Sequence, residues 1–99
     1  MQGDDAMTPT APIAHRPELS RFDTRIEGHL CRLDYRLQGA VMAIHHTEVA
    51  PALEGRGIAS ALVQAAVTHA RAEGLRIRPL CSYVSAWMRR HPEHTDLLA

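Results

Sequence analysis

Several residue types and patterns are scarce or missing in this chain of 99 residues. Lysine is absent, so arginine supplies all 11 basic residues, and these balance 11 acidic residues to a formal net charge of zero. A neutral chain carries no bulk electrostatic signature of binding to nucleic acid or to a membrane surface, and neither partner is expected. No apolar run reaches the length that a membrane-spanning helix requires.

Cysteine is scarce as well. The two cysteines, Cys31 and Cys81, lie 50 residues apart, and the first 20 residues hold no apolar stretch of the length found in secretory signals. A cytoplasmic protein with reduced thiols is therefore expected, in place of a disulfide framework.

The chain has the length of one small domain, and its hydrophobic fraction of 45% is ordinary for a globular protein. Residues 1–19 are expected to form a flexible N-terminal tail. They contain Pro9, Pro12 and Pro17 and few large apolar side chains, so the segment cannot offset its ordering entropy. The folded domain is expected to occupy residues 20–99.

Alternation of apolar and polar residues predicts three strands, over residues 22–26, 29–37 and 40–49. The turn signals Glu27-Gly28 and Gln38-Gly39 separate them. Short turns between alternating runs indicate an antiparallel meander.

The apolar period then changes to that of a helix. Residues 57–73 carry a broad apolar stripe at helical spacing, and Gly74 stands where a left-handed C-terminal cap belongs. A short strand is expected over residues 75–80, and a last helix over residues 83–90. The sequence therefore predicts an α+β fold with a mixed sheet: the meander, a β-loop-α-β unit with parallel strands, and a C-terminal helix.

The loop before the long helix is the most informative segment. A β-prone run ends at Pro51, and Gly55 and Gly57 follow directly before the helix. A strand–glycine loop–helix junction aims unpaired backbone N–H groups and the positive end of the helix dipole at one point, which suits a phosphate or pyrophosphate. Two glycines can equally serve only to make the bend, so the pattern alone leaves both interpretations open.

Four motifs in register carry a family resemblance. They are His46-Thr47-Glu48-Val49, Gly55-Arg56-Gly57-Ile58-Ala59, Pro79-Leu80-Cys81 and Arg90-His91-Pro92. In this order they resemble a subgroup of short members of the GNAT superfamily of acyl-CoA N-acetyltransferases, over roughly residues 20–92. One position departs from the superfamily pattern: Ala52 stands three residues before the first glycine, where glutamine or arginine is usual.

The resemblance implies a truncated GNAT-like fold whose cofactor is acetyl-CoA or CoA. The pantetheine arm would pair with the main chain near residues 47–49, and the pyrophosphate would lie on amides of residues 54–59. Arg56 could add a charged contact, and Arg90 and His91 are candidates for the 3′-phosphate. The cofactor-binding residues expected on this basis are His46, Thr47, Val49, Glu54, Gly55, Arg56, Gly57, Ile58, Ala59, Arg90 and His91.

Cys81 is the candidate nucleophile. It follows the last predicted strand at the carboxyl end of the sheet, and a helix begins directly after it, which lowers the pKa of a thiol. It could accept acetyl and pass it on, or act as a general base. The alternative is a small buried apolar residue, which is how Cys31 is interpreted.

Most of the superfamily uses direct attack by the amine, without a covalent intermediate. On that route Glu48 is a candidate base and Tyr83 a candidate acid. Each has a structural alternative: Glu48 as a residue of the strand surface and Tyr83 as a core residue of the last helix.

No metal is expected, although the chain has seven histidines. The spacing of His45, His46, His91, His94 and Cys81 matches no recognised zinc pattern. Adjacent histidines on a strand also point to opposite faces of a sheet.

The sequence is compatible with two functions. The first is an acetyl-CoA-dependent enzyme that transfers acetyl to an amine. The second is a CoA-binding module without catalysis, acting as a sensor or serving a partner. The turn at Glu27-Gly28 leaves no room for the helices with which longer relatives enclose an acceptor, so an open groove and a macromolecular amine or a polyamine are expected.

Overall fold

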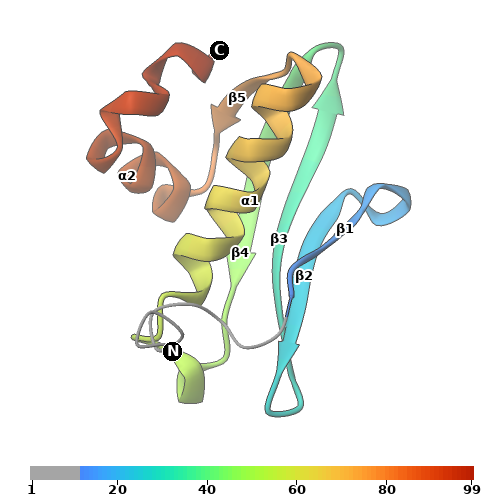
Figure 1. Ribbon diagram of the computed structural model, residues 1–99, viewed down its shortest axis with the longest axis vertical. Helices are drawn as coiled ribbons and strands as arrows, with labels where there is room; N and C mark the ends of the chain where they lie inside the picture. Colours follow the sequence, from blue (N-terminus) through green and yellow to red (C-terminus); the bar gives the residue numbers. More distant parts are fainter. Residues whose placement is uncertain (1–11) are drawn as a thin grey trace, which may run out of the picture.

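The computed structural model describes residues 12–99, which form one mixed sheet and two α-helices. The elements are β1 (Ala14–Arg16), β2 (Arg21–Ile26), β3 (His29–Gln38), β4 (Val41–Glu48), α1 (Ile58–Glu73), β5 (Arg76–Pro79) and α2 (Ser82–Arg90). The strands lie side by side in sequence order; β1 to β4 are antiparallel, and β5 is parallel to β4 (Figure 1). The predicted α+β fold, a meander followed by a β-loop-α-β unit, is confirmed.

Helix α1 lies across one face of the sheet, and α2 lies beside β5 (Figure 1). The apolar stripe predicted for α1 is its buried side, formed by Ile58, Leu62, Val63, Ala66, Val67 and Ala70. Gly74 ends the helix in the left-handed conformation, with φ of 70°, and its N–H bonds back to the last turn. Among residues 12–99 no helix has the length and apolar character to cross a lipid bilayer.

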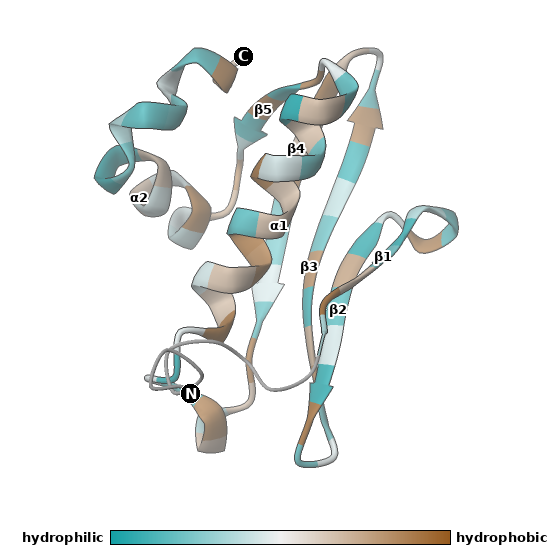
Figure 2. Cartoon of the chain, in the orientation of Figure 1, coloured by the Kyte–Doolittle hydropathy of each residue, from teal (hydrophilic) through white to brown (hydrophobic). Residues whose placement is uncertain are grey.

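The sheet has one apolar face and one charged face. Along β3, Cys31, Leu33 and Tyr35 are buried beneath α1, whereas the residues between them point the other way. This alternation appears as hydrophobic and hydrophilic bands along β3 in Figure 2. Cys31 is fully buried, which confirms its interpretation as a core residue.

A β-bulge interrupts the alternation of β4. The pairing of β3 with β4 shifts between Asp34 and Tyr35, so His46 lies opposite Asp34 and Ile44 lies opposite Tyr35. His45 is the extra residue of β4. In a regular strand, residues three positions apart point to opposite faces. Because of the inserted residue, Ile44 and Thr47 instead both lie on the apolar side of the sheet.

The boundary of the predicted N-terminal tail requires a correction. Residues 1–11 lie outside the described residues, but Ala14–Arg16 form β1, which pairs with the start of β2. The ring of His15 stacks on Phe22, and its Nε2 lies 2.6 Å from the Tyr35 hydroxyl oxygen. These partners come from β2 and β3, so no local pattern within residues 12–19 could indicate the strand.

The folded domain also extends to the last residues. A 3₁₀ segment, Pro92–Leu97, follows α2 and buries Leu97. The Arg71 guanidinium of α1 binds the Asp96 carboxylate at 2.9 Å, and the Ala99 N–H donates to the Ile77 carbonyl of β5. The C-terminal segment therefore covers the outer edge of β5.

The contacts of His15 predict a loss of stability in mild acid. Burial lowers the pKa of His15 below its ordinary value of 6.5, and the nearby His69 lowers it further, against weaker opposing effects of Glu18 and Glu73. The unfolded chain therefore binds this proton more readily than the folded chain, so the free energy of unfolding falls as pH drops through and below about 6.5.

Denaturant unfolding near pH 7.5 and near pH 5.5 would measure this effect. His15→Gln keeps a polar side chain that does not titrate, so its stability should depend less steeply on pH than that of the parent chain. An equally steep dependence in both proteins would contradict the assignment to His15.

Candidate functional site

Strands β4 and β5 part in the middle of the sheet. Their parallel pairing runs only from Val41 to Ile44 of β4, although β4 continues to Glu48. At the parting point the Ile44 carbonyl accepts two N–H groups, from Leu80 at 2.9 Å and from Cys81 at 3.1 Å. Beyond it, in the part of the chain that the structure describes, no strand pairs with residues 45–48 on the side of β5. A polar chain could pair with this open strand edge.

The glycine loop adjoins this opening. Gly55 and Gly57 have φ of 86° and 79°, a left-handed conformation that residues with a side chain rarely adopt. Gly57 is the N-cap of α1 and provides no side-chain cap, and the first turn of α1 carries no acidic residue. The N–H groups of that turn therefore face outward at the positive end of the helix dipole.

An open groove of about 430 Å³ follows the loop and the start of α1. Its lining residues are Val49, Leu53, Glu54, Gly55, Gly57, Ile58, Ala59, Ser60 and Tyr83. The structure thus brings together six of the residues expected to bind the cofactor, and Tyr83 of α2 with them. Leu53 and Ser60 line the groove as well, although they are not among the residues expected from the sequence patterns.

The core and α2 hold these two residues in place. Leu53 is fully buried in the core, which anchors the loop. The Ser60 hydroxyl accepts a hydrogen bond of 2.9 Å from the indole N–H of Trp87. Ser60 could have been included from the sequence, because a serine in the first turn of a helix lies next to the helix N-terminus. Its hydrogen bond to Trp87 could not, because Trp87 is far away in the chain.

Arg56 lies outside the lining of the groove. Its guanidinium binds the Glu27 carboxylate at 2.8 Å, in the turn between β2 and β3, and both side chains are exposed. The hydrogen bond and charge of Arg56 hold the pKa of Glu27 below its ordinary value. An anion in the groove would have to compete with Glu27 for this guanidinium.

Cys81 lies where β5 gives way to α2. Its sulfur lies 3.5 Å from the Thr47 hydroxyl oxygen, across the opening between the two strands. Burial by itself raises the pKa of the Cys81 thiol, but hydrogen bonds from the Thr47 hydroxyl and from the N–H groups of Val84, Tyr83 and Thr47 outweigh it, and the pKa is lowered. Cys81 is half-buried, so its thiolate is both stabilised and accessible.

Glu48 and His46 lie on the other side of the sheet from Cys81. The His46 Nε2 is 3.1 Å from a Glu48 carboxylate oxygen, and Arg32 reaches the same oxygen at 3.3 Å. The hydrogen bond with His46 and then the charge of Arg32 lower the pKa of Glu48. Glu48 is therefore an ionised carboxylate on the strand that carries Thr47.

The candidates for the 3′-phosphate differ in their surroundings. Arg90 is exposed at the end of α2. The His91 ring stacks on Trp87 with 3.7 Å between ring centroids, and its Nδ1 donates to the Trp87 carbonyl at 2.7 Å. His91 thus has a structural role as the residue that ends α2. Across residues 12–99 no three His, Cys, Asp or Glu side chains meet in a metal-binding cluster.

A meander, two parallel strands that part, and a glycine loop at an uncapped helix N-terminus define the fold of the GCN5-like acetyltransferases. The chain belongs to the GCN5-related N-acetyltransferase family, whose model matches residues 21–97.

Relatives and a solved structure agree with this assignment. Protein NATD1 of Xenopus tropicalis is 32% identical over 93 residues, which cover 89% of this chain and 85% of the relative. Protein NATD1 of Bos taurus is 32% identical and covers 92% of this chain and 89% of its own length. The solution NMR structure of a GCN5-like candidate N-acetyltransferase from Staphylococcus aureus superposes with a TM-score of 0.73, at 25% identity and 89% coverage of this chain and 87% of the other.

Proposed function

We propose that this chain binds acetyl-CoA and transfers its acetyl group to an amine. The observation that carries the proposal is the parting of β4 and β5 at Ile44, with Thr47 on one side of the opening and Cys81 on the other. A half-buried thiol of lowered pKa, two residues before the Tyr83 that lines the groove, suits acyl chemistry.

The residues present fit the cofactor. A diphosphate would lie on the N–H groups of residues 55–59, where helix dipole and glycine backbone both favour an anion. The Glu54 N–H is not free for this role, because it donates to the Pro51 carbonyl. Space is open there, because a Cβ built on Gly55 or Gly57 would meet no other atom within 4 Å. The edge of β4 that faces β5 is open at residues 45–48 and is available to the amide groups of a pantetheine arm. Acetyl-CoA would supply the acetyl group as an activated thioester.

The polar groups around the opening can then act in two ways. The Cys81 thiolate is a nucleophile that can accept an acyl group, or a base that can take a proton from an attacking amine. Tyr83 lines the groove, and its hydroxyl is a group that can donate a proton to a departing thiolate. Glu48 is a weak base because its pKa is lowered, so its ionised carboxylate is better suited to holding an ammonium group.

Titration calorimetry with acetyl-CoA and with CoA, followed by mass spectrometry of peptide and small amines incubated with the loaded protein, tests the proposal. The expected result is saturable binding of both cofactors and acetylated amine that appears only with acetyl-CoA. Binding without transfer would favour the non-catalytic CoA-binding module. Absence of binding would overturn the proposal.

A further inference from the structure

The side of the sheet that faces away from α1 is called the open face here. Strand pairing places seven arginines on it against three carboxylates, and none of these residues belongs to the hydrophobic cluster that α1 and α2 cover. They are Arg16, Arg21, Arg25, Arg32, Arg36, Arg76 and Arg78, with Asp23, Asp34 and Glu48. The chain as a whole is neutral, so this positive excess is a property of one face.

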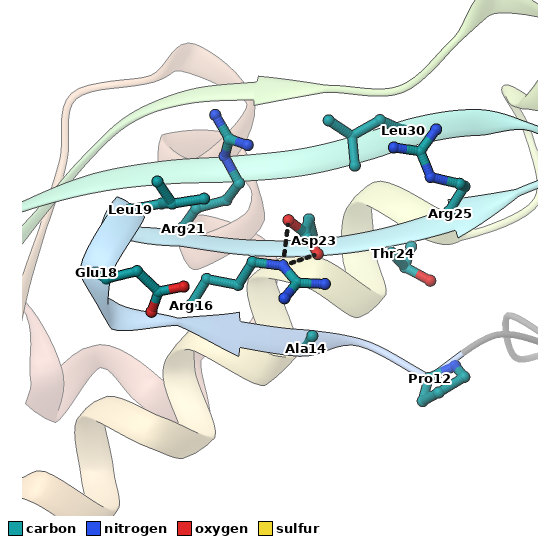
Figure 3. Close-up of a pocket in the computed structure, with 10 residues that line it drawn as sticks. All are labelled: Pro12, Ala14, Arg16, Glu18, Leu19, Arg21, Asp23, Thr24, Arg25 and Leu30. Atoms are coloured by element: carbon teal, nitrogen blue, oxygen red, sulfur yellow. Dashed lines mark hydrogen bonds and ion pairs between the residues drawn. The ribbon is translucent and has the colours of Figure 1, made fainter.

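The three carboxylates are already engaged by arginines. Arg16 binds Asp23 through its Nε at 2.9 and 3.0 Å (Figure 3). Asp34 lies 3.1 Å from Arg21 and 3.1 Å from Arg32. Figure 3 shows the end of the face at β1 and β2, with the side chains of Arg16, Arg21 and Arg25 and the carboxylates of Asp23 and Glu18.

Four arginines of the open face, Arg25, Arg36, Arg76 and Arg78, have no carboxylate partner among residues 12–99. Arg25 donates to the Gly28 carbonyl. Arg36 and Arg78 flank Ala43 on β3 and β5, and both are exposed. Arg78 donates only to the Gln38 side chain, and Arg76 donates to the Leu98 carbonyl. Their charge is therefore available to a binding partner.

The open face adjoins the opening between β4 and β5. His46 and Glu48 stand on it, on either side of Thr47, whose side chain faces Cys81 from the opposite side of the strand. An acceptor that approached along this face would meet the ionised Glu48 carboxylate beside the opening, next to Arg32 of β3.

We propose that the open face binds the acceptor, and that this acceptor is an amine within an acidic polypeptide segment. The inference rests on the proposed function. Aspartates and glutamates of the segment would pair with the arginines, and its ammonium group with Glu48. Along each strand, side chains that share a face repeat every second residue, as they do in an extended peptide laid along the strand.

Other occupants fit these charges less well. A polyamine carries only positive charge, which the arginines repel. A second copy would place its own positive face against this one, because a two-fold interface brings identical patches together. The interleaved carboxylates of Asp23, Asp34 and Glu48 oppose a continuous phosphate backbone, whereas a polypeptide can present both signs of charge.

Fluorescence anisotropy of labelled peptides on the full chain tests the surface without requiring catalysis. One peptide has a central lysine between aspartates and glutamates, and its control has arginines at those positions. The acidic peptide should bind more tightly, and the difference should shrink as salt screens the charges. Tighter binding of the arginine peptide, of spermidine or of an oligonucleotide, or equal binding of both peptides, would overturn the inference.

Substitutions locate the binding. Arg36→Gln combined with Arg78→Gln should weaken acidic-peptide binding about three- to tenfold, as expected for two exposed charge pairs. Arg71→Gln removes the same charge from the helix side of the molecule and should leave peptide binding unchanged. CoA affinity, measured in parallel, should be unaffected in all variants. If CoA fails to bind the parent chain, the proposed function fails, whereas equal peptide binding by parent and double variant refutes only the docking surface.

Discussion

Replacing Cys81 by alanine is expected to lower the rate of acetyl transfer by about a hundredfold or more, while the affinity for CoA stays nearly unchanged. The thiol lies 3.5 Å from the Thr47 hydroxyl and outside the lining of the groove, so its loss removes a reacting group and no cofactor contact. Steady-state kinetics together with titration calorimetry would separate the two effects.

Cys81→Ser is the matched variant. Cys81 is the N-cap of α2, a position at which serine stabilises a helix, so this variant should fold at least as well as the parent chain. A hydroxyl does not ionise near neutral pH, and transfer should still be lost. Full activity in both variants would exclude the thiol from the mechanism and leave direct attack by the amine.

Alkylation gives an independent measure of the same thiol. Cys31 is fully buried, so iodoacetamide should label Cys81 first, and CoA should protect it if the cofactor covers the opening. Because the Cys81 pKa is lowered, its labelling rate should reach half of its maximum at a lower pH than that of a free cysteine.

Ala59→Glu is expected to weaken CoA binding about tenfold or more, ~1.4 kcal/mol, without lowering the melting temperature. Ala59 lines the groove in the first turn of α1, which carries no acidic residue. A carboxylate there repels a diphosphate, yet it interacts favourably with the helix dipole, by about 0.3–1 kcal/mol. Opposite changes in affinity and stability would show that the helix N-terminus holds the anion.

Ala59→Gln is the control, since it has nearly the same volume and no charge. Its CoA affinity should fall much less than that of Ala59→Glu. Equal losses in both variants would mean that bulk alone blocks the groove. Substitution of Gly57 is a poorer test, because its left-handed φ of 79° would strain any β-branched side chain and confuse lost binding with lost folding.

Local pattern was sufficient to predict most of the fold. The stripe of α1, its cap at Gly74 and the alternation of β3 each depend on residues that are close in sequence. Contacts between distant residues account for what was missed: β1 is held by the stacking of His15 on Phe22, and the C-terminal segment by the pairing of Arg71 with Asp96. The bulge at His45 has no glycine to signal it.

In the candidate site, too, local features could be predicted from the sequence and contacts between distant residues could not. The glycine loop could be located from the sequence because its chemistry belongs to the backbone. Side-chain contacts could not be predicted, since Glu27 holds Arg56 from another hairpin and Trp87 stacks on His91. The face of β4 that carries Glu48 depends on the bulge, which shifts the alternation by one residue.

The open face has a chemical consequence for a protein of this family. Its positive charge resides entirely on arginine, whose guanidinium stays protonated at any physiological pH. Protonated guanidinium groups are poor nucleophiles, and the chain contains no lysine that an acetyl donor could modify beside them. Self-acetylation therefore cannot neutralise the arginines of this surface, and the surface keeps its positive charge in the presence of acetyl-CoA.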